Sequence, residues 1–537
     1  MLRTTTLPKT QAVPAILIVA LTLLAAPISG QVMTQTKEPV VGYVGQVERR
    51  AAMAKVPVQR TSKSLAFMSA DDRRQAIDAR WGPGPSTEVK LQIFDKFWEY
   101  VDAKFAAFQG IDVDWNALRN RYRPEVAAGV SRGRFAAIMN QLSLALRDTH
   151  TSAQDLPVNA FTVPVPGVPL LAVGDWTWNQ SGACSTAQPD GSALVYSAMP
   201  GHPLGLERGD RVLGYDGRPW RELYQELVRE ELPLWPLYWG SSPSSFAHTF
   251  ESSATMNWHL FQTMDIAKNS GEVVHVPTSL MPGAVWHGFC SEQMAIPGVP
   301  KPVGTWENDT VSSGVVAGTN VGYIYVWAWG PNSEVDFQQA LLDLTELRRV
   351  DSLIVDFRFN AGGRLFAPHR GLGVLFPHPI PTTGFDERMN PVDHFKMKNF
   401  DLPNSFIMDF DISPTRTRIK EAFDGPIALL VGPGAASSGD MSSYWMTFHP
   451  RVRTFGKSTA STFNLPTQPA LGTELNLGED WFGRIAEANL YRVGRPHQYL
   501  THSEFPIDEH VWLRPEDVAA GKDTVVNAAI RWIGQQR

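Results

Sequence analysis

Two segments of this 537-residue chain share one pattern: a short apolar run, a glycine-containing turn and a stretch compatible with a helix. The first begins at Ser352 and ends at Gly363, and the second runs from Pro426 to Asp440. The β-branched residues of the apolar runs suit buried parallel strands. Because loops and helix N-termini collect at the carboxyl ends of such strands, we expect the two turns to lie together and to carry a site.

The same alternation of strand and helix continues through the C-terminal region. The apolar patterns predict strands at 321–326, 353–357 and 427–431, and helices at 335–347 and 437–448. Alternation of this kind predicts an α/β fold with a mostly parallel sheet. We assign residues 306–537 to this α/β core.

The first half of the chain divides into regions of different composition. Residues 1–30 place basic residues before a short apolar run, which is typical of a signal peptide, and an uncleaved membrane anchor is the alternative. Residues 31–87 are polar and predict a loosely ordered leader. Residues 88–160 carry aromatic residues at helical spacing and predict a helical region. Residues 165–305 predict a β-rich domain, with a Trp/Ser/Pro-rich insertion at 232–246.

Composition and motifs exclude several classes of function. The net charge is −6 and no dense run of Lys and Arg occurs, so nucleic acid is not the expected partner. No metal-binding motif such as His-Glu-x-x-His or paired Cys-x-x-Cys is present, and no P-loop or G-x-G-x-x-G follows a strand. We therefore expect no metal and no cofactor. The signal peptide predicts a secreted or periplasmic protein without a membrane span in its mature form. The oligomeric state is not predicted.

The two cysteines, Cys184 and Cys290, both fall in the predicted β-rich domain. In an oxidising compartment they are able to pair as a disulfide, and the alternative is two unrelated small apolar residues. Neither cysteine follows a strand and a turn, so a cysteine nucleophile is not expected.

The turns predict a site for acyl transfer. Ser437 begins the helix behind the second strand, where small residues leave the backbone uncrowded and the helix dipole favours negative charge. The amides of Gly362, Gly363 and Ser438 are candidates for the oxyanion hole. The alternatives are an ordinary helix-capping serine, with Ser438, Ser442 and Ser443 as competing nucleophiles, and an ordinary tight turn.

His150 is the candidate base. It follows an amphipathic helix, among Asp148, Thr149 and Thr151, which are able to hydrogen-bond its ring into one tautomer. Because the chain has 13 histidines, a surface or structural role is the alternative.

Four segments resemble the tail-specific (C-terminal-processing) serine peptidase family. Residues 353–363 are similar to its apolar-Asp-x-Arg-x-Asn-x-Gly-Gly motif, and residues 434–440 to the segment that holds its nucleophile, which falls on Ser437. Residues 206–217 resemble part of a PDZ domain, and residues 513–523 the family's terminal signature. The resemblance implies a ClpP/crotonase-like α/β core with a PDZ-like domain, and a peptide or unfolded protein as substrate.

One departure from the family pattern points to its tricorn-like branch. The lysine of the Ser–Lys dyad is replaced by Thr462, and Lys457 falls where the family has Glu. Thr149 and His150 resemble the Ser/Thr-His pair of the tricorn-like branch, which also uses a late glutamate. An alignment without gaps places Ser503 at the position of that glutamate, and Glu504 is the next residue. The resemblance therefore implies a serine endopeptidase in which Thr149 and Glu504 tune His150. The alternatives are an inactive relative that binds peptides or apolar ligands, and an esterase or amidase for small acyl substrates.

Overall fold

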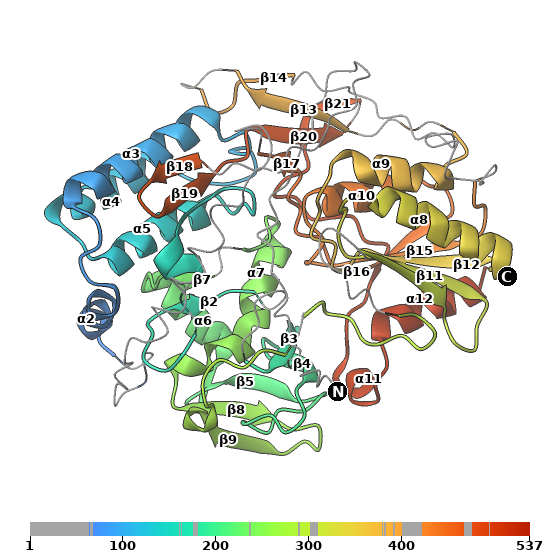
Figure 1. The fold of residues 1–537 in the computed structure, drawn as a ribbon, viewed down its shortest axis with the longest axis horizontal. Coiled ribbons are helices and arrows are strands. Elements are labelled where there is room, and N and C mark those ends of the chain that lie inside the picture. The colour runs from blue at the N-terminus through green and yellow to red at the C-terminus, as the bar shows by residue number, and fades with distance from the viewer. Residues whose placement is uncertain are drawn as a thin grey trace, which may run out of the picture.

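The computed structural model describes residue 64 and residues 68–536, apart from 161, 163, 175–180, 236–237, 288–289, 301–309, 379, 381–382, 390–392, 400–421, 467–474 and 493. The predicted signal peptide and most of the predicted leader lie outside these residues. Figure 1 shows a helical region, a β-rich region and a layered α/β region, with smaller sheets joining them. No helix in the described part of the chain is both long and apolar enough to cross a membrane.

The α/β core contains a six-stranded sheet in the order β10–β11–β12–β15–β16–β22. β10 is antiparallel to β11, and every other pair of neighbours is parallel. This confirms the predicted mostly parallel sheet, and the three predicted strands agree with the structure to within one residue. The strands are β10 (Val311–Val315), β11 (Val321–Val326), β12 (Ser352–Asp356), β15 (Ile427–Val431), β16 (Val452–Gly456) and β22 (Glu509–His510).

Helices cover both faces of this sheet (Figure 1). Successive side chains alternate between two buried clusters, as Tyr323 and Ile324 do on β11. Burial on both faces explains why the central strands β11, β12 and β15 are largely apolar runs in the sequence. One face packs against α8 (Ser333–Leu342), α9 (Phe366–Leu372) and α10 (Ser438–Met446), and the other against α11 (Pro515–Ala519) and α12 (Thr524–Gly534). The predicted helix at 335–347 is α8 followed by a π-helical turn, Asp343–Leu347.

The helical region consists of α3 (Thr87–Lys104), α4 (Trp115–Ala128) and α5 (Arg132–Ala145). Phe94, Phe97 and Trp98 of α3 are at most 6% exposed and pack against Phe135 and Met139 of α5 in one apolar cluster. The aromatic stripe noted in the sequence is therefore part of the core.

Residues 70–81, which we assigned to a loosely ordered leader, form helix α2 (Ala70–Trp81) instead. Ser69 caps the helix and Asp72 lies in its first turn. Its buried contacts come from Ile77 and from Arg73, which pairs with Glu230 at 2.8 Å. The helix was missed because a buried arginine contributes no apolar periodicity.

The β-rich region is an antiparallel sheet in the order β3–β4–β5–β8–β9, with β6 paired to β5. Its likeness to a PDZ domain stays a prediction. The elements are β3 (Ala183–Ala187), β4 (Ala193–Ala198), β5 (Arg211–Tyr215), β6 (Arg218–Pro219), α6 (Trp220–Arg229), α7 (Pro243–Ser252), a 3-10 helix (Ser253–Leu260), β8 (Thr263–Ala267) and β9 (Val273–Pro277).

A disulfide and a buried polar cluster fix β3 to the rest of the chain. Cys184 of β3 is bonded to Cys290, so of the two alternatives for these cysteines the structure has the disulfide. Glu292 follows Cys290 by two residues, and its carboxylate lies 2.6 Å from both Thr186 Oγ1 of β3 and His248 Nε2 of α7. Lys457, which follows β16, donates to the carbonyl of Ala187 at 3.0 Å. The β-rich region is thus joined to the α/β core by buried polar contacts.

Three smaller sheets connect the regions. Strand β1 (Ser152–Asp155) pairs antiparallel with β19 (Trp481–Arg484), which pairs with β18 (Leu475–Gly478). A second sheet contains β14 (Met397–Asn399), β13 (Thr383–Arg388), β20 (Ala488–Arg492), β17 (Asn464–Leu465) and β21 (Arg495–Tyr499). Strands β2 (Leu171–Ala172) and β7 (Leu234–Trp235) form a parallel pair.

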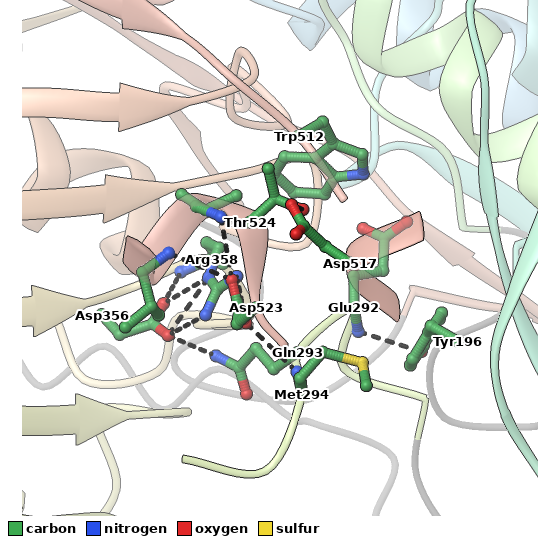
Figure 2. Close-up of polar contacts among 12 residues, drawn as sticks. Tyr196, Glu292, Gln293, Met294, Asp356, Arg358, Trp512, Asp517, Asp523 and Thr524 are labelled. Atoms are coloured by element: carbon green, nitrogen blue, oxygen red, sulfur yellow. Dashed lines mark hydrogen bonds and ion pairs between the residues drawn. The ribbon is translucent and has the colours of Figure 1, made fainter. Parts of the chain in front are cut away.

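Arg358 is a fully buried charge at the end of β12, and it contacts two carboxylates (Figure 2). Its guanidinium lies 2.8 Å from Asp356 and 2.9 Å from Asp523. Asp523 also caps α12 by accepting from the amides of Val525 and Val526, and it accepts from the amide of Met294. The terminal signature at 513–523 and the motif at 353–363 therefore meet at one buried ion-pair network.

Removing one partner of this network is expected to destabilise the fold strongly. We predict that Asp523→Ala lowers the free energy of unfolding by about 3–5 kcal/mol, because it leaves the Arg358 charge buried with one carboxylate fewer and removes a helix cap. Urea unfolding monitored by circular dichroism measures the change.

Asp517→Ala is the matched control, since this partly exposed aspartate accepts one hydrogen bond from Thr524. It should cost about 1 kcal/mol or less. Equal losses for the two variants would contradict the importance assigned to the buried pair.

Candidate active site

The turns that follow β12 and β15 are in direct contact, as the sequence predicts. The amide of Ala436 donates to the carbonyl of Asn360 at 2.9 Å. A Cβ atom on Gly439 would lie 2.0 Å from that carbonyl oxygen, and one on Gly362 would lie 2.7 Å from the Cβ of Ser437. Glycine is therefore required at both positions, because only its missing side chain permits this approach.

Ser437 has an unusual backbone conformation at the N-terminus of α10. Its φ of 60° and ψ of −124° are rare for a residue with a side chain, and such conformations cost about 1–3 kcal/mol. The residue is 1% exposed, and its Oγ has no hydrogen-bond partner among the described residues. A strained serine between a strand and a helix, with an uncommitted hydroxyl, is the arrangement of a nucleophile elbow.

The carboxylate of Asp440 holds Ser437 in this conformation. One carboxylate oxygen accepts from the amides of Ser437 and Thr462, and the other from the amide of Ser461, all at 2.9 Å. Burial raises the pKa of Asp440 from 3.8 to about 7, and the amide hydrogen bonds oppose this rise. Asp440 thus fixes both the serine turn and the segment after residue 460.

The three candidate oxyanion-hole amides differ in whether they already donate a hydrogen bond within the protein. The amide of Gly362 donates to the side-chain oxygen of Asn360 at 3.0 Å. The amides of Gly363 and Ser438 make no hydrogen bond to other described residues. Gly363 and Ser438 are therefore the two candidates whose N–H groups are not used in hydrogen bonds to described residues.

His150 is 1% exposed and is bound by polar residues from two regions of the chain. Its Nδ1 lies 2.8 Å from Oδ1 of Asn464, and its backbone amide donates to Asp148 at 3.3 Å. Burial and then the nearby Arg484 guanidinium lower the pKa of His150 below its ordinary 6.5, whereas Asp148 and Asn464 raise it. The ring is therefore neutral at neutral pH, which is the state that a base requires.

The candidate base and the candidate nucleophile are attached to one short segment, residues 461–464. The amides of Ser461 and Thr462 bind Asp440, which also binds the amide of Ser437, and Asn464 binds His150. Two residues separated by nearly three hundred positions thus share a hydrogen-bonded connection of a few residues.

Three other residues singled out in the sequence have different surroundings. The hydroxyl of Thr149 donates to the carbonyl of Trp239. The carboxylate of Glu504 is exposed and accepts from the amide and hydroxyl of Ser244, at the start of α7. Lys457 lies in the buried cluster with His248, where burial lowers its pKa to about 8. The hydrogen bonds to the His150 ring and backbone instead involve Asn464 and Asp148.

Sequence reasoning did not identify Asp440 or Asn464. A signal for Asp440 was present in the sequence, because the Ser-x-x-Asp spacing of Ser437 and Asp440 is a capping-box pattern. Asn464 carries no local signal, because its role depends on contacts with a residue more than three hundred positions away. The described residues hold no group of three or more His, Cys, Asp or Glu side chains suited to a metal ion.

Comparison with known proteins gives two family matches and several similar folds. A crystal structure of mature CPAF has a TM-score of 0.51 at 12% identity, covering 81% of this chain and 94% of that one. CPAF complexed with lactacystin gives 0.50 at 12% identity, covering 83% and 98%. The photosystem II D1 C-terminal processing protease gives 0.38 at 14% identity, covering 80% and 94%. No curated protein matches the sequence.

One family match contains the candidate nucleophile, and the other ends shortly before the candidate base. Residues 320–479, which contain Ser437 and both turns, match the model of peptidase family S41. Residues 86–143, which end seven positions before His150, match the model of the tricorn protease C1 domain. Over these residues the chain is similar to peptidase family S41 and to the tricorn protease C1 domain.

Proposed function

We propose that this protein is a secreted or periplasmic serine endopeptidase, with Ser437 as nucleophile and His150 as base. The amides of Gly363 and Ser438 form the oxyanion hole, and Gly362 shapes it. The substrate is a peptide or an unfolded protein, as the match to a peptidase family supports.

The observation that carries this proposal is the shared attachment of Ser437 and His150 to residues 461–464. A serine hydroxyl becomes an effective nucleophile only when a neutral base accepts its proton, and the buried, neutral His150 supplies one. The Oγ of Ser437 has no hydrogen-bond partner among the described residues, so its hydroxyl is available to a base.

In the proposed reaction, the Ser437 oxygen attacks the peptide carbonyl while His150 Nε2 takes the hydroxyl proton. The negative charge of the tetrahedral intermediate falls on the former carbonyl oxygen, where the two amides donate hydrogen bonds. The C–N bond then breaks as His150 returns the proton to the leaving amine. Water attacks the resulting acyl-enzyme by the same two proton transfers, which releases the acid and restores Ser437.

The disulfide supports the proposed location outside the cytoplasm. Cys184 and Cys290 account for both cysteines of the chain, and disulfides persist in oxidising compartments. The basic and then apolar residues at 1–30 are consistent with export to such a compartment.

Substitution of the nucleophile tests the proposal directly. We expect Ser437→Ala to lower kcat/KM for peptide hydrolysis by roughly 10⁴-fold or more, with an unchanged circular dichroism spectrum. A fluorophosphonate should label the native protein covalently, and peptide mapping should find the label on Ser437.

Ser443→Ala is the matched control, because Ser443 lies in the same helix and its hydroxyl donates to the carbonyl of Gly439. This variant should keep its hydrolytic activity and its label. Hydrolysis that survives Ser437→Ala would rule out the assignment, and a native protein that is neither labelled nor active would indicate a binding protein. Faster turnover of small esters than of peptides would indicate an esterase.

The protonation of His150 gives a second test. Because burial lowers its pKa, the ring should titrate below 6.5, and the loss of kcat/KM caused by protonating His150 should begin only as the pH drops through that lower value. Asp440 titrates near 7, so a pH–rate profile alone mixes the two groups. NMR of ¹³C-labelled histidine, assigned with His150→Gln, observes the ring directly. A midpoint at or above 6.5 would contradict the prediction.

A further inference from the structure

We propose that Asn464, supported by Asp148, is the positioning residue that fixes His150 in its Nδ1–H tautomer. This inference rests on the proposed function. In a Ser-His-Asp triad the third residue orients the histidine, and here we assign that role to the neutral amide of Asn464, with the carboxylate of Asp148 behind it. Neither residue touches the substrate, and each acts through the ring of His150.

The hydrogen bonds determine which way the side chain of Asn464 faces. Its Nδ2 lies 3.0 Å from Oδ1 of Asp148, and a carboxylate only accepts hydrogen bonds. The amide group must therefore present its NH₂ to Asp148 and its oxygen to His150 Nδ1, which is 2.8 Å away. That oxygen has no proton to give, so His150 must carry its proton on Nδ1.

The consequence for catalysis follows from the tautomer. A neutral imidazole holds one ring proton, so a protonated Nδ1 leaves the lone pair on Nε2. That lone pair is the one that accepts the Ser437 proton in the proposed reaction. With the other tautomer, Nε2 would carry a proton and the ring would not serve as a base at that nitrogen.

The two supporting residues are themselves held firmly. Asp148 accepts from the hydroxyl of Thr151 at 2.6 Å, and Thr151 accepts from the amide of Ala486 at 3.0 Å. Asn464 is fully buried on β17, where it faces Asn489 of β20. Locked partners of this kind are what a precisely oriented catalytic histidine requires.

The charges around His150 are consistent with a neutral partner on its ring. Asp148 raises the pKa of His150, the Arg484 guanidinium on β19 lowers it, and a second buried histidine, His502, also senses Asp148. An amide oxygen at Nδ1 stabilises imidazolium less than a carboxylate there would. Asn464 therefore fixes the tautomer while leaving the base neutral in mildly acidic solution.

The test compares two buried asparagines that face each other across β17 and β20. Asn464→Leu keeps the branched shape and the number of heavy atoms of the side chain, and it removes the acceptor for His150. We expect kcat to fall by about 10²–10⁴-fold with KM changed by less than about threefold. Asn489→Leu removes a buried asparagine that bonds to Thr501 and Ala106 and has no hydrogen bond to His150. It should lower the melting temperature to a similar degree while kcat stays within about threefold of the native value.

The tautomer itself supplies a readout that a purely structural role would not change. In ¹⁵N NMR at pH 7.5, His150 should show a protonated Nδ1 in the native protein and in Asn489→Leu, and a protonated Nε2 in a substantial fraction of Asn464→Leu. Asn464→Asp keeps an acceptor for the Nδ1 proton of His150, and a proton shared with Asp148 would take the place of the lost amide N–H, so this variant should keep the native tautomer.

Three results would overturn the inference: a protonated Nε2 in the native protein, an unchanged tautomer in Asn464→Leu, or equal losses of kcat in the two leucine variants. These outcomes are separate from failure of the proposed function. A native protein that hydrolyses no peptide would refute the peptidase, and the NMR measurement would still decide whether Asn464 sets the tautomer.

Discussion

The arrangement of the candidate site depends on the hydrogen bonds that the buried carboxylate of Asp440 accepts. It gathers three backbone amides from two segments and forces Ser437 into a conformation that a serine otherwise avoids. A buried carboxylate is costly without donors, and buried amides are costly without an acceptor, so each stabilises the other's position. The strain at Ser437 persists because these bonds over-determine it.

The ion pairs of Arg358 anchor the other turn of the candidate site. Arg358 begins the turn that leads to Gly362 and Gly363, and its bonds to Asp356 and Asp523 tie that turn to the N-terminus of α12. The serine turn and the glycine turn are therefore each anchored by a buried charge, one from α10 and one from α12. Their close contact at Gly439 and Asn360 leaves little freedom for either to move alone.

The sequence predicted the elements whose signal is local. Strands β11, β12 and β15 are buried on both faces, so their apolar runs marked them to within one residue, whereas β10, β16 and β22 were not predicted. Helix α2 was missed because its buried contacts include Arg73. Whether Cys184 and Cys290 pair stayed open because the sequence does not show that two cysteines 106 positions apart come together. Asn464 was invisible for a related reason: its partners become neighbours only when the chain folds.

The position of His150 shows how widely the site is assembled. It follows α5 of the helical region and precedes β1, which pairs with β19 of the C-terminal region. Beside that pairing, the amide of Ala486 donates a hydrogen bond to the hydroxyl of Thr151. From β17, the side chain of Asn464 binds the ring of His150. Because each of these attachments crosses between regions distant in sequence, the ring reaches its place only when the helical region has docked on the α/β core. The same contacts that orient the proposed base thus make its orientation a property of the whole fold rather than of one loop.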